Sequence, residues 1–237
     1  MIPNDPYTGL QVARRLHLLG DWDLALEVLD GHDGTDVREL RAEILFDRFF
    51  WRMEGIQAAA TAISALDQQS VQFSYLTARL AYSRLLFQME PLPDDYETSE
   101  AGYRVVAADP ALHGWGEFHW GVLADNVGAD NNTATEHYKR AFEFCRQHED
   151  LILESYVIRH LAGQSLDGDR PEALRMLRRS LHLRSTSGMR PQTAAAQLAL
   201  ARALPEADPE RATLLQSARA VADELGLAWV QQGLKDL

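Results

Sequence analysis

Apolar residues recur along most of the chain at intervals of three and four positions, the spacing at which one face of an α-helix returns. Capping residues, glycines and prolines interrupt this pattern repeatedly. No segment alternates strictly between apolar and polar residues between two hairpin turns, so the sequence predicts an all-α protein. The predicted helices are 8–19, 22–31, 36–52, 55–67, 71–88, 94–108, 113–127, 133–147, 151–166, 171–184, 191–204 and 209–225, with a short thirteenth around 227–234.

Small residues mark the second half of each predicted hairpin. An alanine opens an apolar stripe that continues four and seven residues later, most clearly at Ala134, Tyr138 and Ala141. Because two helices approach closely only where neither presents a bulky side chain, these alanines are interpreted as helix crossing points. The six anchors are Ala25, Ala59, Ala101, Ala134, Ala173 and Ala212, at intervals of 34, 42, 33, 39 and 39 residues, and the weaker stripes continue at Leu29 and His32, Ile63 and Leu66, Val105 and Ala108, and Leu177 and Ser180.

Capping patterns predict where several helices begin. Thr133 with Glu136 three residues later has the form of a capping box. Asp208 before Pro209 places a polar cap ahead of a proline at the first helical position. Asp36, followed by a glutamate three residues later, is a third predicted start.

Three groups of residues share one pattern along the chain, namely Gly20, Trp22 and Ala25, then Ala134, Tyr138 and Ala141, then Gly168 and Ala173. Through these residues the chain resembles the tetratricopeptide repeat family, and Trp115 lies near the family's usual tryptophan position in a first helix. The family's period is 34 residues. The resemblance implies one domain, 1–237, built as a right-handed α-solenoid of about six antiparallel helix hairpins plus a C-terminal capping helix. The units are approximately 7–34, 35–69, 70–110, 111–149, 150–188 and 189–226, with the cap at 227–237.

In this family the first helices of successive hairpins line a concave groove that holds a peptide or a partner's helix. Positions about 8, 11, 15 and 18 residues before an anchor are expected to face that groove, and the third unit contributes a helical stripe of its own. The predicted partner-binding residues are Tyr7, Arg14, His17, Arg41, Arg48, Trp51, Tyr75, Arg79, Tyr82, His119 and Asn126. The alternative is that Trp51 and Tyr75 are interior packing residues and that Arg48 is solvated or paired within its helix.

Composition and charge narrow the expected partners. The net charge is −12, with 35 acidic and 23 basic residues, which argues against nucleic acid as the main partner. Cys145 is the only cysteine, so neither an intramolecular disulfide nor a cysteine-based zinc site is expected. No signal peptide or membrane-spanning run is recognised, which predicts a cytoplasmic protein without a membrane partner.

Candidate chemistry is sparse. His113 and Glu117 stand one helical turn apart and could share a metal, with His119 nearby, but no second ligand pair accompanies them. Nucleotide-binding and hydrolase motifs are absent, and Cys145 is interpreted as a packing residue. The family's lysine and asparagine clamp for a terminal carboxylate is not reproduced. The expectation is therefore no catalytic residue, no metal and no cofactor.

The predicted function is that of a non-catalytic adaptor or scaffold that binds a protein or peptide. A second hypothesis is a sensor for a small peptide or metabolite, which requires a closed apolar pocket. The run from Ser180 to Leu227 resembles helical sensor regions of bacterial regulators. An enzyme with a site built from scattered helix residues, and a homodimer formed through exposed end helices, are the remaining alternatives.

Overall fold

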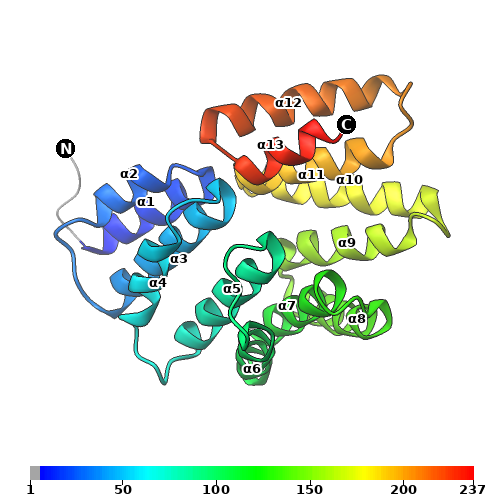
Figure 1. Cartoon of the computed structure of the whole chain (residues 1–237). Helices are drawn as coiled ribbons and strands as arrows, with labels where there is room; N and C mark the ends of the chain where they lie inside the picture. Colours follow the sequence, from blue (N-terminus) through cyan, green and yellow to red (C-terminus); the bar gives the residue numbers. More distant parts are fainter. Residues whose placement is uncertain (1–5) are drawn as a thin grey trace. The chain divides into compact units, whose positions relative to one another are not determined.

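The computed structural model describes the chain from residue 6 onward, with side chains from residue 8, and this part is all-helical without a strand (Figure 1). Every predicted helix has its counterpart. The helices are α1 (Pro6–Leu19), α2 (Trp22–Leu29), α3 (Thr35–Arg52), α4 (Ile56–Ser64), α5 (Val71–Phe87), α6 (Asp95–Ala108), α7 (His113–Asn126), α8 (Asn131–His148), α9 (Leu151–Ser165), α10 (Arg170–Thr186), α11 (Arg190–Ala203), α12 (Pro209–Leu225) and α13 (Ala228–Lys235).

The helices form two compact units. The first contains residues 6–66 and 184–237, and the second contains residues 67–183, so the boundary between them falls within α10. Helices that follow one another along the chain pack together in both units, as in the pairs α1 and α2, α5 and α6, α7 and α8, and α11 and α12. This consecutive packing is the arrangement expected of helix hairpins.

The first unit joins the two ends of the chain. Its core contains Trp22, Leu29 and Ile44 from the first three helices together with Leu198 and Val230 from α11 and α13. Helix α13 packs on α3 as well as on its neighbour α12, and α1 packs on α11. In a strictly linear solenoid each repeat contacts only its neighbours. The first unit departs from that rule because its last helices pack on its first ones.

Two specific contacts join α13 and the end of α12 to α3. The indole of Trp51 meets that of Trp229 edge to face, with 5.8 Å between ring centroids. The guanidinium of Arg52 donates from Nε to the carbonyl oxygen of Leu225 at 3.1 Å. Trp51 is 6% exposed, so this indole is part of the core.

The second unit has a core of large side chains that includes Tyr103, Leu123, Tyr138 and Leu153. Its helices approach one another closely at glycines. A Cβ added at Gly116 would lie 2.3 Å from the backbone nitrogen of Ala107, so α7 and α6 can cross at this distance only without a side chain there. At Gly102 an added Cβ would stand 2.6 Å from the carbonyl oxygen of Ser74, which sets the crossing of α6 on α5 in the same way.

Four of the six predicted crossing alanines are buried, but Ala101 and Ala212 are exposed and their assignment was wrong. In α6 the buried stripe with spacing four and seven is Ser99, Tyr103 and Val106, two residues upstream of the predicted one. The serine hydroxyl can occupy the crossing because it donates to the backbone oxygen of its own helix and of α5, at Asp95 and Ala78. In α12 the buried positions are Leu214, Ala218, Ala222 and Leu225.

Helix starts agree with the capping predictions in one case of three. Asp208 accepts from the backbone N–H of Glu210 and caps α12, as predicted. The predicted capping box at Thr133 is wrong, because α8 begins one turn earlier and Asp130 accepts from the Thr133 N–H. Helix α3 begins at Thr35 after a glycine, so Asp36 lies inside its first turn.

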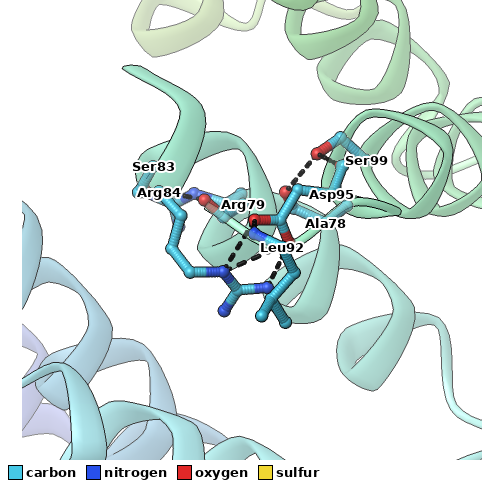
Figure 2. Close-up of polar contacts among 7 residues, drawn as sticks. All are labelled: Ala78, Arg79, Ser83, Arg84, Leu92, Asp95 and Ser99. Carbon is cyan, nitrogen blue, oxygen red and sulfur yellow. Dashed lines mark hydrogen bonds and ion pairs between the residues drawn. The ribbon is translucent and has the colours of Figure 1, made fainter. Parts of the chain in front are cut away.

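A buried ion pair holds the connection between α5 and α6, which contains two prolines (Figure 2). Asp95 is 1% exposed and receives both Nε and Nη2 of Arg84 in a two-pronged contact. Its Oδ2 also accepts from the backbone N–H of Leu92 at 2.7 Å. The carboxylate therefore ties the loop to the end of α5, which fixes the geometry of this hairpin.

Candidate functional site

The first helices of the three hairpins in the second unit carry matching stripes of side chains. Each stripe has the spacing 0, 4, 7 and 11, which places its members on one helical face. The stripes are Tyr75, Arg79, Tyr82 and Leu86 on α5, Trp115, His119, Val122 and Asn126 on α7, and Ile152, Tyr156, Arg159 and Gly163 on α9. These twelve positions are called the inner stripes below.

Helices α5 and α7 run side by side in one register. The hydroxyl of Tyr75 lies 3.2 Å from Nδ1 of His119, and Asn126 donates from Nδ2 to the hydroxyl oxygen of Tyr82 at 2.6 Å. Both contacts join residues 44 positions apart. Because the offset is the same for two contacts that lie two turns apart, the two helices run parallel, and Tyr75 and Tyr82 each meet the α7 stripe one position further along.

His119 is held by the backbone and by aromatic rings. Its Nδ1 lies 3.1 Å from the carbonyl oxygen of Trp115, an acceptor, so the proton of the neutral ring is on Nδ1 and points toward this oxygen and the hydroxyl oxygen of Tyr75. The imidazole also contacts the rings of Tyr103 and Phe118, at centroid distances of 5.5 and 4.9 Å. The histidine thus has a defined orientation between α5 and α7.

Helices α7 and α9 are joined by aromatic contacts. Trp115 meets Tyr156 edge to face at 5.4 Å, and Phe118 contacts both Tyr156 and His160 at 5.6 and 5.4 Å. Edge-to-face pairs of this kind add about 0.5–1.5 kcal/mol beyond the burial of their area. A continuous layer of rings therefore runs from Tyr75 on α5 to Tyr156 on α9.

A series of hydrogen bonds beside this layer joins Arg159, His160, Tyr138 and Asp125. The guanidinium of Arg159 donates from Nη1 to Nε2 of His160 at 3.0 Å, which leaves the imidazole proton on Nδ1. That nitrogen lies 3.0 Å from the hydroxyl of Tyr138, and the hydroxyl donates to Asp125 at 2.9 Å. The pKa of Asp125 is lowered by His160, against the opposing effect of burial, with a further contribution from Tyr138. Asp125 is therefore held as a carboxylate.

The other carboxylates of α7 and α9 point to the second helices of their hairpins. Glu117 is buried and accepts from Nδ1 of His137 at 2.7 Å and from Nε of Arg140 at 2.6 Å. Burial alone would raise the pKa of Glu117, but these two partners outweigh it and the pKa is lowered. On α9, Glu154 pairs with Arg179 of α10.

The inner stripes combine core and partly exposed residues, since Tyr82 and Val122 belong to the core of the second unit. Tyr75, Arg79, His119 and Tyr156 are half-buried, and Asn126 is exposed. The guanidinium of Arg79 sits over the ring of Tyr75, 5.4 Å from its centroid. The arrangement offers aromatic surface and hydrogen-bonding groups in fixed positions.

Four further predicted residues either are more deeply buried or lie in the first unit. Tyr82 is 5% exposed, and burial raises the pKa of its hydroxyl far above the ordinary value. Arg14 is exposed on α1, and His17 bonds Asp47 of α3 at 2.7 Å. Tyr7 lies in α1, but its side chain is outside the described residues.

The remaining predicted residues of α3 are engaged within the first unit. Arg41 donates to Asp30 and to the carbonyl oxygen of Leu29, and Arg48 donates to Asp23 at 2.7 Å. With Trp51 in the core, the predicted face of α3 is occupied by α2 and α13. Trp51 is therefore an interior packing residue, as the alternative prediction stated. Arg48 forms an ion pair with Asp23 of α2, and not a pair within α3.

The three residues weighed as metal ligands have separate partners. Nδ1 of His113 donates to the carbonyl oxygen of Ala107 at 2.6 Å, while Glu117 faces α8 and His119 faces Tyr75. Among the described residues no three histidine, cysteine or carboxylate side chains are grouped to hold a metal. Burial raises the pKa of the Cys145 thiol to about 12, which opposes formation of the nucleophilic thiolate.

The inner-stripe residues of α9 were not predicted. The rule that counts 8, 11, 15 and 18 residues back from the anchor alanine does not reach them. Counting back from Ala173 leads to Ser155, Ile158 and Ala162, which are buried and lie one residue before the inner-stripe positions Tyr156, Arg159 and Gly163. A usable signal was present, because Tyr156 and Arg159 repeat the aromatic and arginine spacing of α5.

No protein-family model matches this chain, and no curated protein shows significant similarity to it. In the part of the chain that the structure describes, none of the helices combines the length and apolar character needed to cross a membrane.

Proposed function

We propose that this protein is a tetratricopeptide-like adaptor that binds a protein or peptide through the inner stripes of α5, α7 and α9, without catalysis. The observation that carries the proposal is the repetition of one stripe on three first helices, joined by contacts at a constant offset of 44 residues between α5 and α7. A right-handed arrangement of about six hairpins, with these stripes on its concave side, is part of the proposal.

The chemistry of the stripes supports a binding role. Tyr, Trp and Arg are the residues that dominate the energy of protein interfaces. The two aromatic residues bury much area with few rotatable bonds, and the guanidinium of Arg offers several donors in a planar fork. Here Tyr75, Trp115, Tyr156 and the two arginines are half-buried and held by neighbours before any partner arrives. Side chains that are already ordered lose less entropy on binding.

Site-specific photo-cross-linking tests this proposal. Gly163 lies on the α9 stripe and Gly168 lies in the turn after α9, and in both cases an added Cβ would have no heavy atom within 4 Å. Either position accepts p-benzoylphenylalanine without a clash. In cells that produce the protein, we expect a specific macromolecular adduct from position 163 and none from the matched control at 168.

A second variant distinguishes a true partner from chance collisions. Tyr75→Ala combined with Tyr156→Ala should remove the adduct at 163, whereas Lys139→Ala, on the exposed face of α8, should leave it unchanged. An absent adduct, or one that forms equally at 163 and 168, would contradict a macromolecular partner on this face.

A further inference from the structure

The core of the second unit contains a tyrosine hydroxyl without a partner. Tyr103 of α6 is fully buried, and within the part of the chain that the structure describes its hydroxyl makes no hydrogen bond. The hydroxyls of three neighbouring tyrosines, Tyr75, Tyr82 and Tyr138, all have partners. An unpaired buried polar group costs folding free energy, and a phenylalanine would fill the same space without that cost. Packing alone therefore does not explain the hydroxyl of Tyr103.

The ring of Tyr103 lies behind the inner stripes of α5 and α7. One turn earlier on α6, Ser99 donates to the carbonyl oxygen of Ala78, so this part of α6 lies against α5 (Figure 2). The ring centroid of Tyr103 is 5.5 Å from that of His119 on the α7 stripe. A residue of a second helix thus contributes to the face that the first helices form.

The charges around this hydroxyl oppose one another. The pKa of Tyr103 is raised well above its ordinary value, first by burial and then by Tyr82, while Arg79 opposes the shift. Burial also raises the pKa of Tyr82, and the carboxylate of Asp125 adds to that rise. A cation that entered here would be opposed by Arg79 and an anion by Asp125, and either would lose its hydration. A neutral polar group avoids these costs.

Tyr82 offers a second hydroxyl proton beside Tyr103. Asn126 donates from Nδ2 to the hydroxyl oxygen of Tyr82 at 2.6 Å, so the proton of that hydroxyl is left for another acceptor. A carbonyl oxygen has two lone pairs and accepts from two donors. The two hydroxyls together therefore suit the oxygen of an amide group.

We infer that a side-chain carboxamide of the partner, from an asparagine or a glutamine, enters between the stripes of α5 and α7 and accepts a hydrogen bond from the hydroxyl of Tyr103. The inference rests on the proposed function of the same face. Because the hydroxyl is fully buried, entry requires a stripe side chain to move. Arg79, which lies over the ring of Tyr75 at 5.4 Å, is the long and flexible one and can swing aside without a change of backbone.

Selection of random twelve-residue peptides displayed on phage, with the full chain as the immobilised protein, tests the inference. We expect the selected peptides to share an asparagine or glutamine at one position. Tyr103→Phe should bind these peptides about tenfold more weakly, which is the contribution of one hydrogen bond. Replacement of the shared residue by leucine should cost the unaltered chain the same factor and should cost the variant little, because both changes remove one contact.

Thermal unfolding gives a second readout that a structural role would move in the opposite direction. Tyr103→Phe removes an unpaired buried hydroxyl, so its unfolding midpoint should stay constant or rise by up to about 4 °C. Thr77→Val is the matched control, because the Thr77 hydroxyl also has no partner among the described residues. Thr77 stands two residues before Arg79, on the opposite side of α5, so this change should leave peptide binding unaltered.

The outcomes separate this inference from the proposed function. Peptides without a shared amide, or with equal affinity for Tyr103→Phe and the unaltered chain, would overturn the carboxamide site. Loss of those same peptides in Tyr75→Ala combined with Tyr156→Ala would leave the binding face intact. Peptides unaffected by the tyrosine-to-alanine changes, or no selected peptides, would contradict both. A lower unfolding midpoint for Tyr103→Phe would reveal an internal partner for the hydroxyl and would also overturn the carboxamide site.

Discussion

The first helices of the two units carry similar residues but meet different surroundings. In the first unit, Arg41 and Arg48 of α3 bond the aspartates of α2, and Trp51 packs under Trp229 of α13. In the second unit the corresponding kinds of residue remain half-buried, supported by their neighbours on α5, α7 and α9. Aromatic and arginine residues at groove spacing therefore do not identify a binding face by themselves. What matters is whether the chain's own elements already occupy that face.

The largest expected effect is on the stability of the first unit. Trp51→Ala should lower the free energy of unfolding by about 3–5 kcal/mol, because it empties a buried aromatic site. Trp115→Ala should cost about 1–2 kcal/mol, because that indole is half-buried. Urea unfolding followed by circular dichroism measures both, and hydrogen exchange assigns each loss to its unit. Equal losses of unfolding free energy would mean that Trp51 and Trp115 are buried to the same extent. The proposed difference between the two units would then be contradicted.

The second expectation concerns the buried ion pair of the second unit. Asp95→Asn should cost about 3 kcal/mol, because it leaves the guanidinium of Arg84 partly buried without its counter-ion. The matched control is Glu100→Gln, which removes the exposed pair with Arg104 and should change stability by less than about 0.5 kcal/mol. Similar results for the two variants in urea unfolding would show that the loop before α6 does not depend on this contact.

The third expectation is a dependence on pH. Because the folded-state pKa of Glu117 lies below its ordinary value of 4.5, its partners stabilise the fold fully above that value, and the stabilisation is lost as pH falls through the folded pKa. Glu117→Gln should therefore cost about 1.5–3 kcal/mol at neutral pH, and the difference from the unaltered chain should close on acidification. Thermal unfolding between neutral and acidic pH measures the gap, and a gap that stays constant would contradict this assignment.

The smallest expected effect is on the exposed ion pairs of the first unit. Asp23 is shared by Arg48 and Arg52 at 2.7 Å each, but its side chain is 56% exposed, so Asp23→Asn should change stability by less than about 1 kcal/mol. Arg48→Ala should also leave the cross-link at position 163 unchanged. Loss of that cross-link would show that the α3 arginine takes part in binding and would erase the distinction between the units.

The helices themselves could be predicted from the sequence because the local periodicity of apolar residues indicates them, whereas two of the three predicted caps were wrong. The positions at which two helices cross could be predicted only where the anchor alanine is also a buried residue. Alanine is the best helix former at exposed and buried positions alike, so Ala101 and Ala212 gave the pattern without the packing. At the true crossing in α6, Ser99 satisfies its hydroxyl with backbone oxygens, a solution that an apolar pattern does not reveal.

The candidate site was predicted in part. Tyr75, Arg79, His119 and Asn126 lie on the inner stripes, whereas Tyr156 and Arg159 were missed because the register shifts by one residue in α9. That α2 and α13 cover the predicted face of α3 could not be predicted from the sequence, for a different reason. A repeat pattern reports contacts between neighbours along the chain, and the contact of Trp51 with Trp229 joins residues from opposite ends.

The union of the chain's two ends in one core has a consequence for biosynthesis. During translation α1 to α3 are made before residues 67–183, whereas their apolar partners on α11 to α13 are made after them. The contiguous residues 67–183 have no such delay and can form their hairpins as they appear. Contacts between residues so distant in sequence also form slowly. The amino-terminal helices therefore pass through a period with an exposed apolar face, during which a chaperone would have its best opportunity to bind the nascent chain.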